Sequence, residues 1–281
     1  MPVALGNRVS KRECGLLLVG HGTRDPRGLA EFHDLSRQVA ALAHGFHVEP
    51  CFLELAQPDI PTAVGGLIER GVRQISIAPL MLFAAGHAKR DIPQAVEKAV
   101  AAQMGSGEWG MGNGRNLNSN QIPINYLPAL ECDPRILELS GQRFGEALAG
   151  KPTVDPAETL LLLVARGSSS PEATAMMHRF AELRSKSTPV ACVEVCFVAK
   201  AQPSLETTLA RALDSSFRLI IVQPHLLFAG QVLEQITYCV EKAGAGDNSR
   251  LQREWILTGH LGPSPLVAQA LVQLAGSLVA Q

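Results

Sequence analysis

Short apolar runs and longer amphipathic stretches alternate along the chain. The runs are rich in Leu, Ile and Val, which predicts buried strands at 16–19, 48–55, 74–83, 124–130, 160–164, 190–198, 218–228 and 255–260. The stretches between them have helical periodicity, which predicts helices at 28–42, 60–70, 92–103, 134–148, 171–183, 205–213, 233–243 and 265–279. Apolar strands that alternate with helices indicate the doubly wound α/β class, a mainly parallel sheet with helices on both faces.

The second half of the chain repeats the first. LLLVGHGT, which starts at Leu16, returns as LLLVARGS at Leu161, 145 positions later. CFLELAQP, which starts at Cys51, returns at the same offset as CFVAKAQP from Cys196, with 5 of 8 residues identical. A third block, ISIAPLMLF from Ile75, keeps this register, and one position is lost after it. Three blocks at one offset indicate a tandem duplication.

The duplication sets the predicted domain boundaries. We expect two domains of the same class, at 14–149 and 159–281. Between them, residues 150–158 carry the Pro and charged residues that are common in interdomain linkers. Residues 105–121 are rich in Gly, Asn and Ser and are expected to form a surface loop.

The charge and the cysteines narrow the partners and the compartment. The 281 residues include 25 basic and 26 acidic side chains, so no overall positive field attracts nucleic acid or an anionic membrane. Six cysteines without a C-x-x-C pair are typical of a reduced protein. Since no apolar run reaches about 18 residues and no secretion-signal core is found, the sequence predicts a cytoplasmic protein.

Three side chains that can bind a metal follow successive strands of the first domain. His21 follows the first strand, Glu54 lies at the end of the second, and His87 lies in the turn after the third, at equal spacings of 33. Ligands of open α/β sheets bind beyond the carboxyl ends of the strands, so we expect the three along one edge. Two imidazoles and a carboxylate suit a divalent first-row metal such as Fe²⁺, Co²⁺, Ni²⁺ or Zn²⁺.

Each of these residues also has an ordinary explanation. A single His beside Gly at a strand end is commonly a turn residue or a hydrogen-bonding partner. Glu54, in an apolar run, reaches the cleft or pairs with a base, because burying a lone carboxylate is costly. Their joint occurrence at equivalent strand ends favours the metal site.

The second domain lacks all three groups. The positions equivalent to His21, Glu54 and His87 hold Arg166, Ala199 and Gln231. A guanidinium stays protonated and has no lone pair for a metal, so this half cannot bind one in the same way. Loss of the three together suggests that they act together, and we predict one active and one degenerate half.

Taken together, the motifs of the first domain resemble the sirohydrochlorin chelatases, the class II tetrapyrrole chelatases. The resemblance is carried by GHGTR from Gly20, FLE from Phe52 with Gln57-Pro58, PLMLF from Pro79, Gly86-His87 and DIP from Asp91. It covers most of residues 14–148, and the duplicated length is similar to the long form of the cobalt enzyme. The second half departs from the pattern at all three reactive positions, and we expect it to support the fold or to help enclose the substrate.

The resemblance implies a lyase that inserts Co²⁺, toward cobalamin, or Fe²⁺, toward sirohaem, into sirohydrochlorin with release of two protons. His21 and His87 would then bind the metal and take up protons, with Glu54 as third ligand or as the group that orients an imidazole. The divalent metal is a substrate, and no organic cofactor is expected. No P-loop and no GxGxxG supports nucleotide chemistry.

The same resemblance assigns a carboxylate-rich substrate to the cleft. Sirohydrochlorin bears eight carboxylates, and Arg24, Lys89 and Arg90 are placed to meet them. Because one chain carries both halves, we expect a monomer with pseudo-two-fold tandem domains.

Two other functions fit the same residues. A non-catalytic carrier of a divalent metal or a tetrapyrrole would use the same His/Glu/His site. A structural module with incidental histidines would not depend on it. The other histidines are expected to be structural, at His33 and its repeat partner His178, or ordinary turn and surface residues, at His44, His47, His225 and His260.

Overall fold

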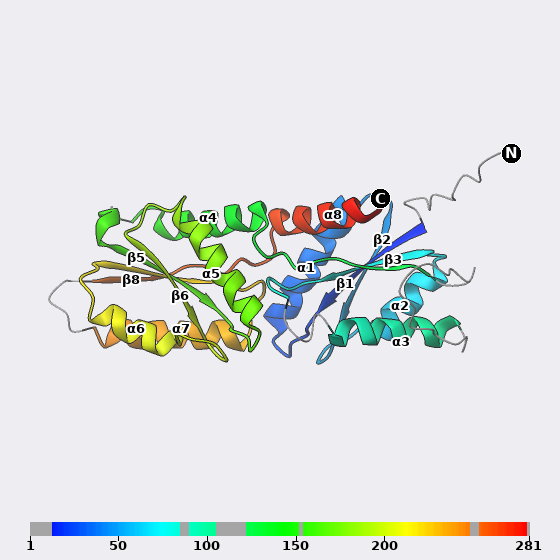
Figure 1. Ribbon diagram of the computed structural model, residues 1–281, viewed down its shortest axis with the longest axis horizontal. Helices are drawn as coiled ribbons and strands as arrows, with labels where there is room; N and C mark the ends of the chain where they lie inside the picture. Colours follow the sequence, from blue (N-terminus) through cyan, green and yellow to red (C-terminus); the bar gives the residue numbers. More distant parts are fainter. Residues whose placement is uncertain (1–12, 85–89, 105–121, 152–153, 248–252, 280–281) are drawn as a thin grey trace.

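A computed structural model describes residues 13–84, 90–104, 122–151, 154–247 and 253–279. Within them the chain forms two four-stranded parallel sheets, in the strand orders β2-β1-β3-β4 and β6-β5-β7-β8. Each sheet belongs to one half of the molecule (Figure 1). The doubly wound α/β class, present twice in tandem, is therefore confirmed.

The predicted elements are all present, and most of their bounds shift by a few residues. The first half contains β1 (Cys14–Gly20), α1 (Pro26–Leu42), β2 (Phe46–Phe52), α2 (Ile60–Glu69), β3 (Gln74–Pro79), α3 (Ile92–Met104), β4 (Ile124–Tyr126) and α4 (Pro134–Leu148). After a short 3-10 helix (Pro156–Glu158), the second half contains β5 (Thr159–Ala165), α5 (Pro171–Ser185), β6 (Cys192–Phe197), α6 (Leu205–Leu213), β7 (Leu219–Pro224), α7 (Gln231–Ala245), β8 (Glu254–Leu257) and α8 (Pro265–Val279).

Several strands end earlier than their apolar runs do. β2 stops at Phe52, and Leu55 takes a left-handed backbone conformation, with φ 64°, that no strand accommodates. β3 stops at Pro79, where Met81 donates its N–H to the Pro79 carbonyl and turns the chain. The apolar residues beyond these points pack in loops, so hydrophobicity alone overestimates the strands.

Both faces of each sheet are buried. In β1, Leu16 and Leu18 face a central core between the two sheets, whereas Leu17 and Val19 face an outer core under α2 and α3. The second sheet is covered in the same way, with an outer core under α6 and α7. This double burial explains why the strands are uniformly apolar.

The last helix of each half packs on the other half. α4 follows the last strand of the first half but packs against α5, and its Ser140 carbonyl accepts a hydrogen bond from Gln223 of β7 at 2.8 Å. α8 ends the second half but packs against α1 and β3. Figure 1 shows the two helices crossing over to opposite sheets. The halves are therefore tied together by an exchange of helices, which the repeat did not predict.

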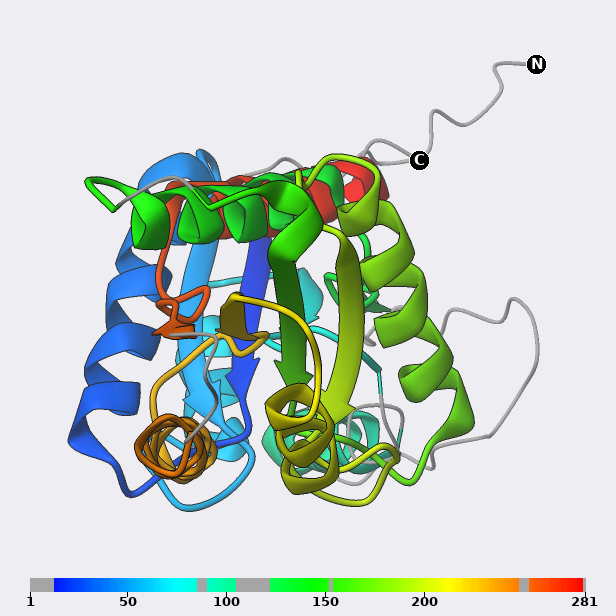
Figure 2. The ribbon, with the colours of Figure 1, turned by 90° about the vertical axis from the view of Figure 1, so that its left-hand side faces the viewer.

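The strands of both sheets point the same way. In Figure 2 the arrowheads of the central strands β1 and β5 lie at the bottom, so their carboxyl ends open onto one face of the molecule. Among the helices of the described residues, none combines the length and apolar character needed to cross a bilayer.

Candidate functional site

The site of the first half is built by a close approach of two loops. Gly22 follows the turn after β1 with φ 99°, and a Cβ at this position would lie 1.7 Å from the Glu54 carbonyl oxygen. Only glycine combines that conformation with that contact. The loops are joined by hydrogen bonds from the N–H of Leu53 to the Gly20 carbonyl, at 2.9 Å, and from the N–H of Glu54 to the His21 carbonyl, at 3.1 Å.

This backbone places two of the three predicted ligands together. His21 Nε2 lies 3.3 Å from Glu54 Oε1, and 35% and 55% of the two side chains are exposed. An ion pair this open to water stabilises a fold by about 1 kcal/mol at most, so stability alone does not explain it. An imidazole and a carboxylate that share an open strand edge can bind a divalent metal and accept protons.

The other predicted site residues are placed to different extents. Arg24 is exposed on the turn between His21 and α1. Arg90 is also exposed, and its Nε lies 3.4 Å from Asp91 Oδ1. His87 and Lys89 lie outside the described residues. In the described part of the chain, no group of three His, Cys, Asp or Glu side chains is arranged to hold a metal ion.

The second half keeps the turn but not the chemistry. Gly167 has φ 88°, and a Cβ there would lie 1.8 Å from the Ala199 carbonyl oxygen. The N–H of Ala199 donates to the Arg166 carbonyl at 2.9 Å. Gln231, which takes the place of His87, is the first residue of α7. The scaffold of the site therefore persists where its ligands are absent.

The loop between β7 and α7 packs beside the site. The N–H of Ala229 donates to Glu31 Oε2 at 2.6 Å, and Arg27 of α1 pairs with Glu234 of α7. At Gly28 a Cβ would lie 2.4 Å from the Ala229 carbonyl oxygen. The equivalent of Gly28 in the second half is Ala173. The difference between the two halves at this position could therefore have indicated the contact from the sequence.

Two histidines contradict the expectation of ordinary surface positions. His260 Nε2 lies 3.1 Å from both carboxylate oxygens of Glu31 and joins the two halves. His225 is 3% exposed and lies between the rings of Phe83 and Phe180, with centroid distances of 5.3 and 4.2 Å. Burial lowers the pKa of His225 to about 3, so the imidazole is neutral.

Other polar groups near the sheets suit packing rather than chemistry. His33 and His178 lie edge-on to Phe52 and Phe197, respectively, and these contacts are equivalent in the repeat, in agreement with a structural role. Burial raises the pKa of the Cys51 thiol far above its usual range, so Cys51 in β2 does not supply a thiolate ligand.

Comparisons with known proteins agree with the fold and the duplication. The chain is 30% identical over 214 residues to a sirohydrochlorin ferrochelatase of Priestia megaterium, and the alignment covers 76% of this chain and 71% of that protein. It is 27% identical over 269 residues to a sirohydrochlorin cobaltochelatase of the same organism, with 92% and 78% covered.

Solved structures share the whole architecture. SirB from Bacillus subtilis with Fe³⁺ superposes with a TM-score of 0.78 at 24% identity, over 95% of this chain and 96% of that one. The sirohydrochlorin chelatase SirB from Bacillus subtilis subspecies spizizenii in complex with cobalt gives a TM-score of 0.74 at 23% identity, with 95% of each chain covered. The CbiX family model matches twice, at residues 15–147 and 160–277, and this protein therefore belongs to the CbiX family.

Proposed function

We propose that this protein is a sirohydrochlorin chelatase, a lyase that inserts Co²⁺ or Fe²⁺ into sirohydrochlorin. The observation that carries the proposal is the contact of His21 with Glu54 at the open carboxyl edge of β1, in a chain of this family. The relatives named sirohydrochlorin ferrochelatase and cobaltochelatase align across both halves.

The reaction exchanges protons for a metal ion. Two pyrrole N–H bonds break as nitrogen–metal bonds form, and the two protons pass to acceptors on the protein or in water. His21 and His87 are proposed to bind the metal and accept protons, because an imidazole does both near neutral pH. Glu54, at 3.3 Å from His21, is proposed to complete the ligand set or to orient the imidazole.

Cations around the cleft are proposed to bind the substrate. Arg24 is exposed three positions after His21, and Lys89 and Arg90 follow His87 in the sequence. Guanidinium groups form bidentate hydrogen bonds with carboxylates, and sirohydrochlorin carries eight of these. Such contacts would hold the macrocycle over the metal.

The setting of the reaction is part of the proposal. Residues 14–149 are the catalytic domain, and residues 159–281 are a repeat without metal ligands. The protein works as a monomer, with the two halves joined by the exchanged helices, and needs no organic cofactor. Six free cysteines are consistent with the cytoplasm.

An anaerobic insertion assay tests the proposal. The protein is mixed with sirohydrochlorin and Co²⁺ or Fe²⁺, and the absorbance change is followed beside a protein-free sample. We expect a large acceleration with the natural protein and an initial rate about 100-fold lower with His21→Ala, because a ligand and proton acceptor is lost. His44→Ala, an exposed histidine after α1, is the matched control.

The assay also separates the alternatives. If the natural protein leaves the rate at the protein-free value, the enzyme function is wrong. Co²⁺ binding that His21→Ala abolishes would then support a carrier. Metal and tetrapyrrole binding that neither His21→Ala nor His87→Ala changes would support a structural module.

A further inference from the structure

Most arginines of the described residues have an acidic partner. Within the described residues, every exposed arginine lies within ion-pair distance of a carboxylate except Arg24 and Arg166. Arg24 is already a proposed substrate contact. Arg166 occupies the same turn in the second half, and its guanidinium is ready to receive an anion from outside the protein.

Arg166 stands where the first half has a metal ligand. It follows β5 as His21 follows β1, and the hydrogen bond from Ala199 to its carbonyl matches that from Glu54 to His21. The two turns have the same backbone, so His21 and Arg166 occupy equivalent positions.

A second cation appears in the neighbouring loop. Lys200 has φ 60°, and its equivalent in the first half, Leu55, has φ 64°. A left-handed conformation is unusual for either residue, so the loops are alike in detail. In the first half these positions hold the imidazole of His21, the carboxylate of Glu54 and the side chain of Leu55. In the second half they hold the guanidinium of Arg166, the methyl group of Ala199 and the ammonium of Lys200. At these three positions the second half has lost an anion and gained two cations.

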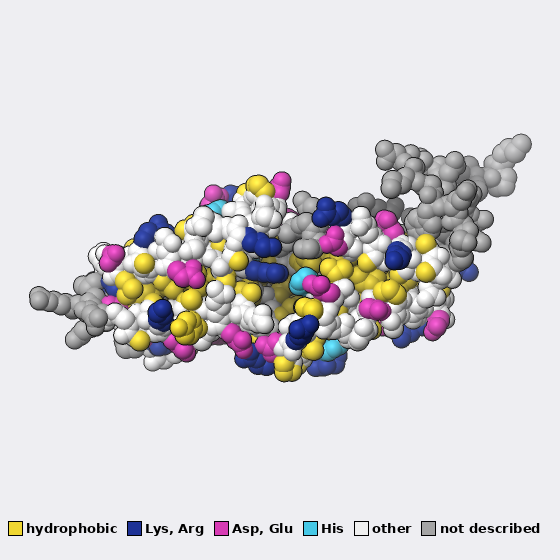
Figure 3. Space-filling model, turned by 90° about the horizontal axis from the view of Figure 1, so that it is seen from below, with side chains coloured by type: hydrophobic (Ala, Val, Ile, Leu, Met, Phe, Trp, Pro, Cys, Tyr) yellow, Lys and Arg dark blue, Asp and Glu magenta, His cyan; other side chains and the backbone are white. Residues whose placement is uncertain are grey.

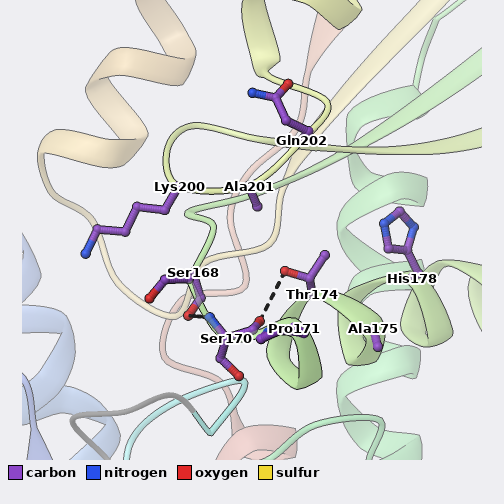
Figure 4. A pocket seen from close by; sticks show the side chains of 10 residues that line it. Ser168, Ser170, Pro171, Thr174, Ala175, His178, Lys200, Ala201 and Gln202 are labelled. Carbon is purple, nitrogen blue, oxygen red and sulfur yellow. Dashed lines mark hydrogen bonds between the residues drawn. The ribbon is translucent and has the colours of Figure 1, made fainter.

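A cavity lies next to Lys200. It has a volume of about 460 Å³, and its polar lining comes from Ser168, Ser170, Thr174, Lys200 and other residues that include no carboxylate. Figure 4 shows Lys200 extending from the loop after β6, with Ser168 and Ser170 on the turn after β5. The Ser170 hydroxyl donates to Glu172 and the Thr174 hydroxyl donates to the Ser170 carbonyl, so the Lys200 ammonium and the Ser168 hydroxyl are the groups that can meet an anion.

The two sites open in the same direction. The central strands β1 and β5 end on one face, as Figure 2 shows. Seen from below, that face is hollowed near the middle of the molecule, and basic, acidic and histidine side chains gather there (Figure 3). One large planar ligand can therefore meet both halves.

We infer that Arg166 and Lys200 of the degenerate half bind carboxylate groups of the tetrapyrrole, while the first half handles the metal. The inference rests on the proposed function for the identity of the ligand. Arg166 offers a bidentate fork and Lys200 a mobile point charge, which together suit a rim of flexible carboxylate side chains. The first copy of the turn thus keeps the metal ligands, and the second copy adds cations that bind the substrate.

Titration of metal-free sirohydrochlorin into the protein, followed by absorbance, tests this division. We expect Arg166→Gln and Lys200→Gln each to raise the Kd about tenfold, because each removes a charge-assisted hydrogen bond. Arg166→Lys should recover part of the loss. Arg218→Gln, an exposed arginine that pairs with Glu158 before β7, is the control and should bind like the natural protein.

Two further readouts separate this inference from the proposed function. In the insertion assay the variants should raise KM and leave kcat near its natural value, since the lost contacts exist before and during the reaction. Co²⁺ alone should bind to the variants and the natural protein equally. Unchanged sirohydrochlorin affinity in both variants overturns the inference even if the natural protein is active. A natural protein that binds sirohydrochlorin through Arg166 but inserts no metal leaves the inference standing and overturns the chelatase function.

Discussion

The turns after β1 and β5 have the same backbone conformation but carry different functional groups. Gly22 and Gly167 each lie so close to a carbonyl oxygen that an added Cβ would be less than 2 Å from it, which only glycine avoids. His21 and Arg166, in contrast, differ completely, although they precede these glycines. The fold fixes the residues on which the turn depends, whereas the exposed side chains beside them are free to change. Function in this protein is therefore assigned from what differs between the halves.

The largest effect should come from the group that only the first half has. We expect Glu54→Gln to lower the initial rate of metal insertion about 100-fold, because the neutral amide cannot serve as an anionic ligand or hold the imidazole of His21 in place. Insertion is measured anaerobically with Co²⁺ and with Fe²⁺. Glu206→Gln, an exposed residue at the start of α6, should be as active as the natural protein. A loss below about threefold in Glu54→Gln would remove Glu54 from the site.

The next effect concerns a histidine that has replaced an apolar residue. His225 takes the place of Leu80, and its buried Nε2 has no hydrogen-bond partner within the described residues. The folded chain binds a proton here only near its lowered pKa of about 3, whereas the unfolded chain binds one near 6.5. The unfolded state therefore holds more protons in this window, and the free energy of unfolding falls as the pH falls from about 6.5 toward 3.

Restoring the residue of the first half should remove this acid sensitivity. We expect the advantage of His225→Leu over the natural protein to be about 3 kcal/mol larger at pH 4.5 than at pH 7, since the slope reaches about 1.4 kcal/mol per pH unit. Urea unfolding at both pH values measures it. His44→Leu, at an exposed position, controls for the loss of any histidine. If the free energies of unfolding of the natural protein and His225→Leu change equally with pH, His225 is protonated in the folded state as it is in the unfolded state.

The sequence predicted the features that depend on local pattern. Apolar runs located the strands, and adjacent parallel strands necessarily brought His21 and Glu54 to one edge. It did not predict the contact of Glu31 with Ala229, because these residues are 198 positions apart and neither carries a pattern. The exchange of α4 and α8 was also hidden, since a helix with one apolar face packs equally well on either sheet. The position of His87 was predicted from its place after the third strand, and it lies outside the described residues.

A moderate effect is expected at the helix start where the halves meet. Gly28→Ala places a methyl group 2.4 Å from the Ala229 carbonyl oxygen, so the loop before α7 must move. We expect the free energy of unfolding to fall by about 2 kcal/mol, as overpacking does in buried sites. Urea unfolding measures the loss, with Gly66→Ala, whose Cβ meets nothing within 4 Å, as the control. Equal free energies of unfolding for the two variants would mean that the loop before α7 moves away from Gly28 without loss of stability.

The smallest effect should come from the charges that join α1 to α7. Arg27 pairs with Glu234, and the equivalent positions of the other half hold the reversed charges, Glu172 and Arg90. Glu234→Lys sets two cations against each other and should lower the free energy of unfolding slightly at low salt. Part of this loss belongs to the first turn of α7, where an acidic residue favours the helix dipole.

A double-mutant cycle with Arg27→Gln separates the two contributions to that loss. The cost of Glu234→Lys should shrink in the Arg27→Gln background, and the difference is the interaction between the halves. It should disappear in 1 M salt, where the Debye length is about 3 Å, and Glu241→Lys on the same helix should show no such coupling. A cost of Glu234→Lys that is the same with and without Arg27 would assign the whole effect to the helix. The reversed charges of the two halves would then have no role in holding them together.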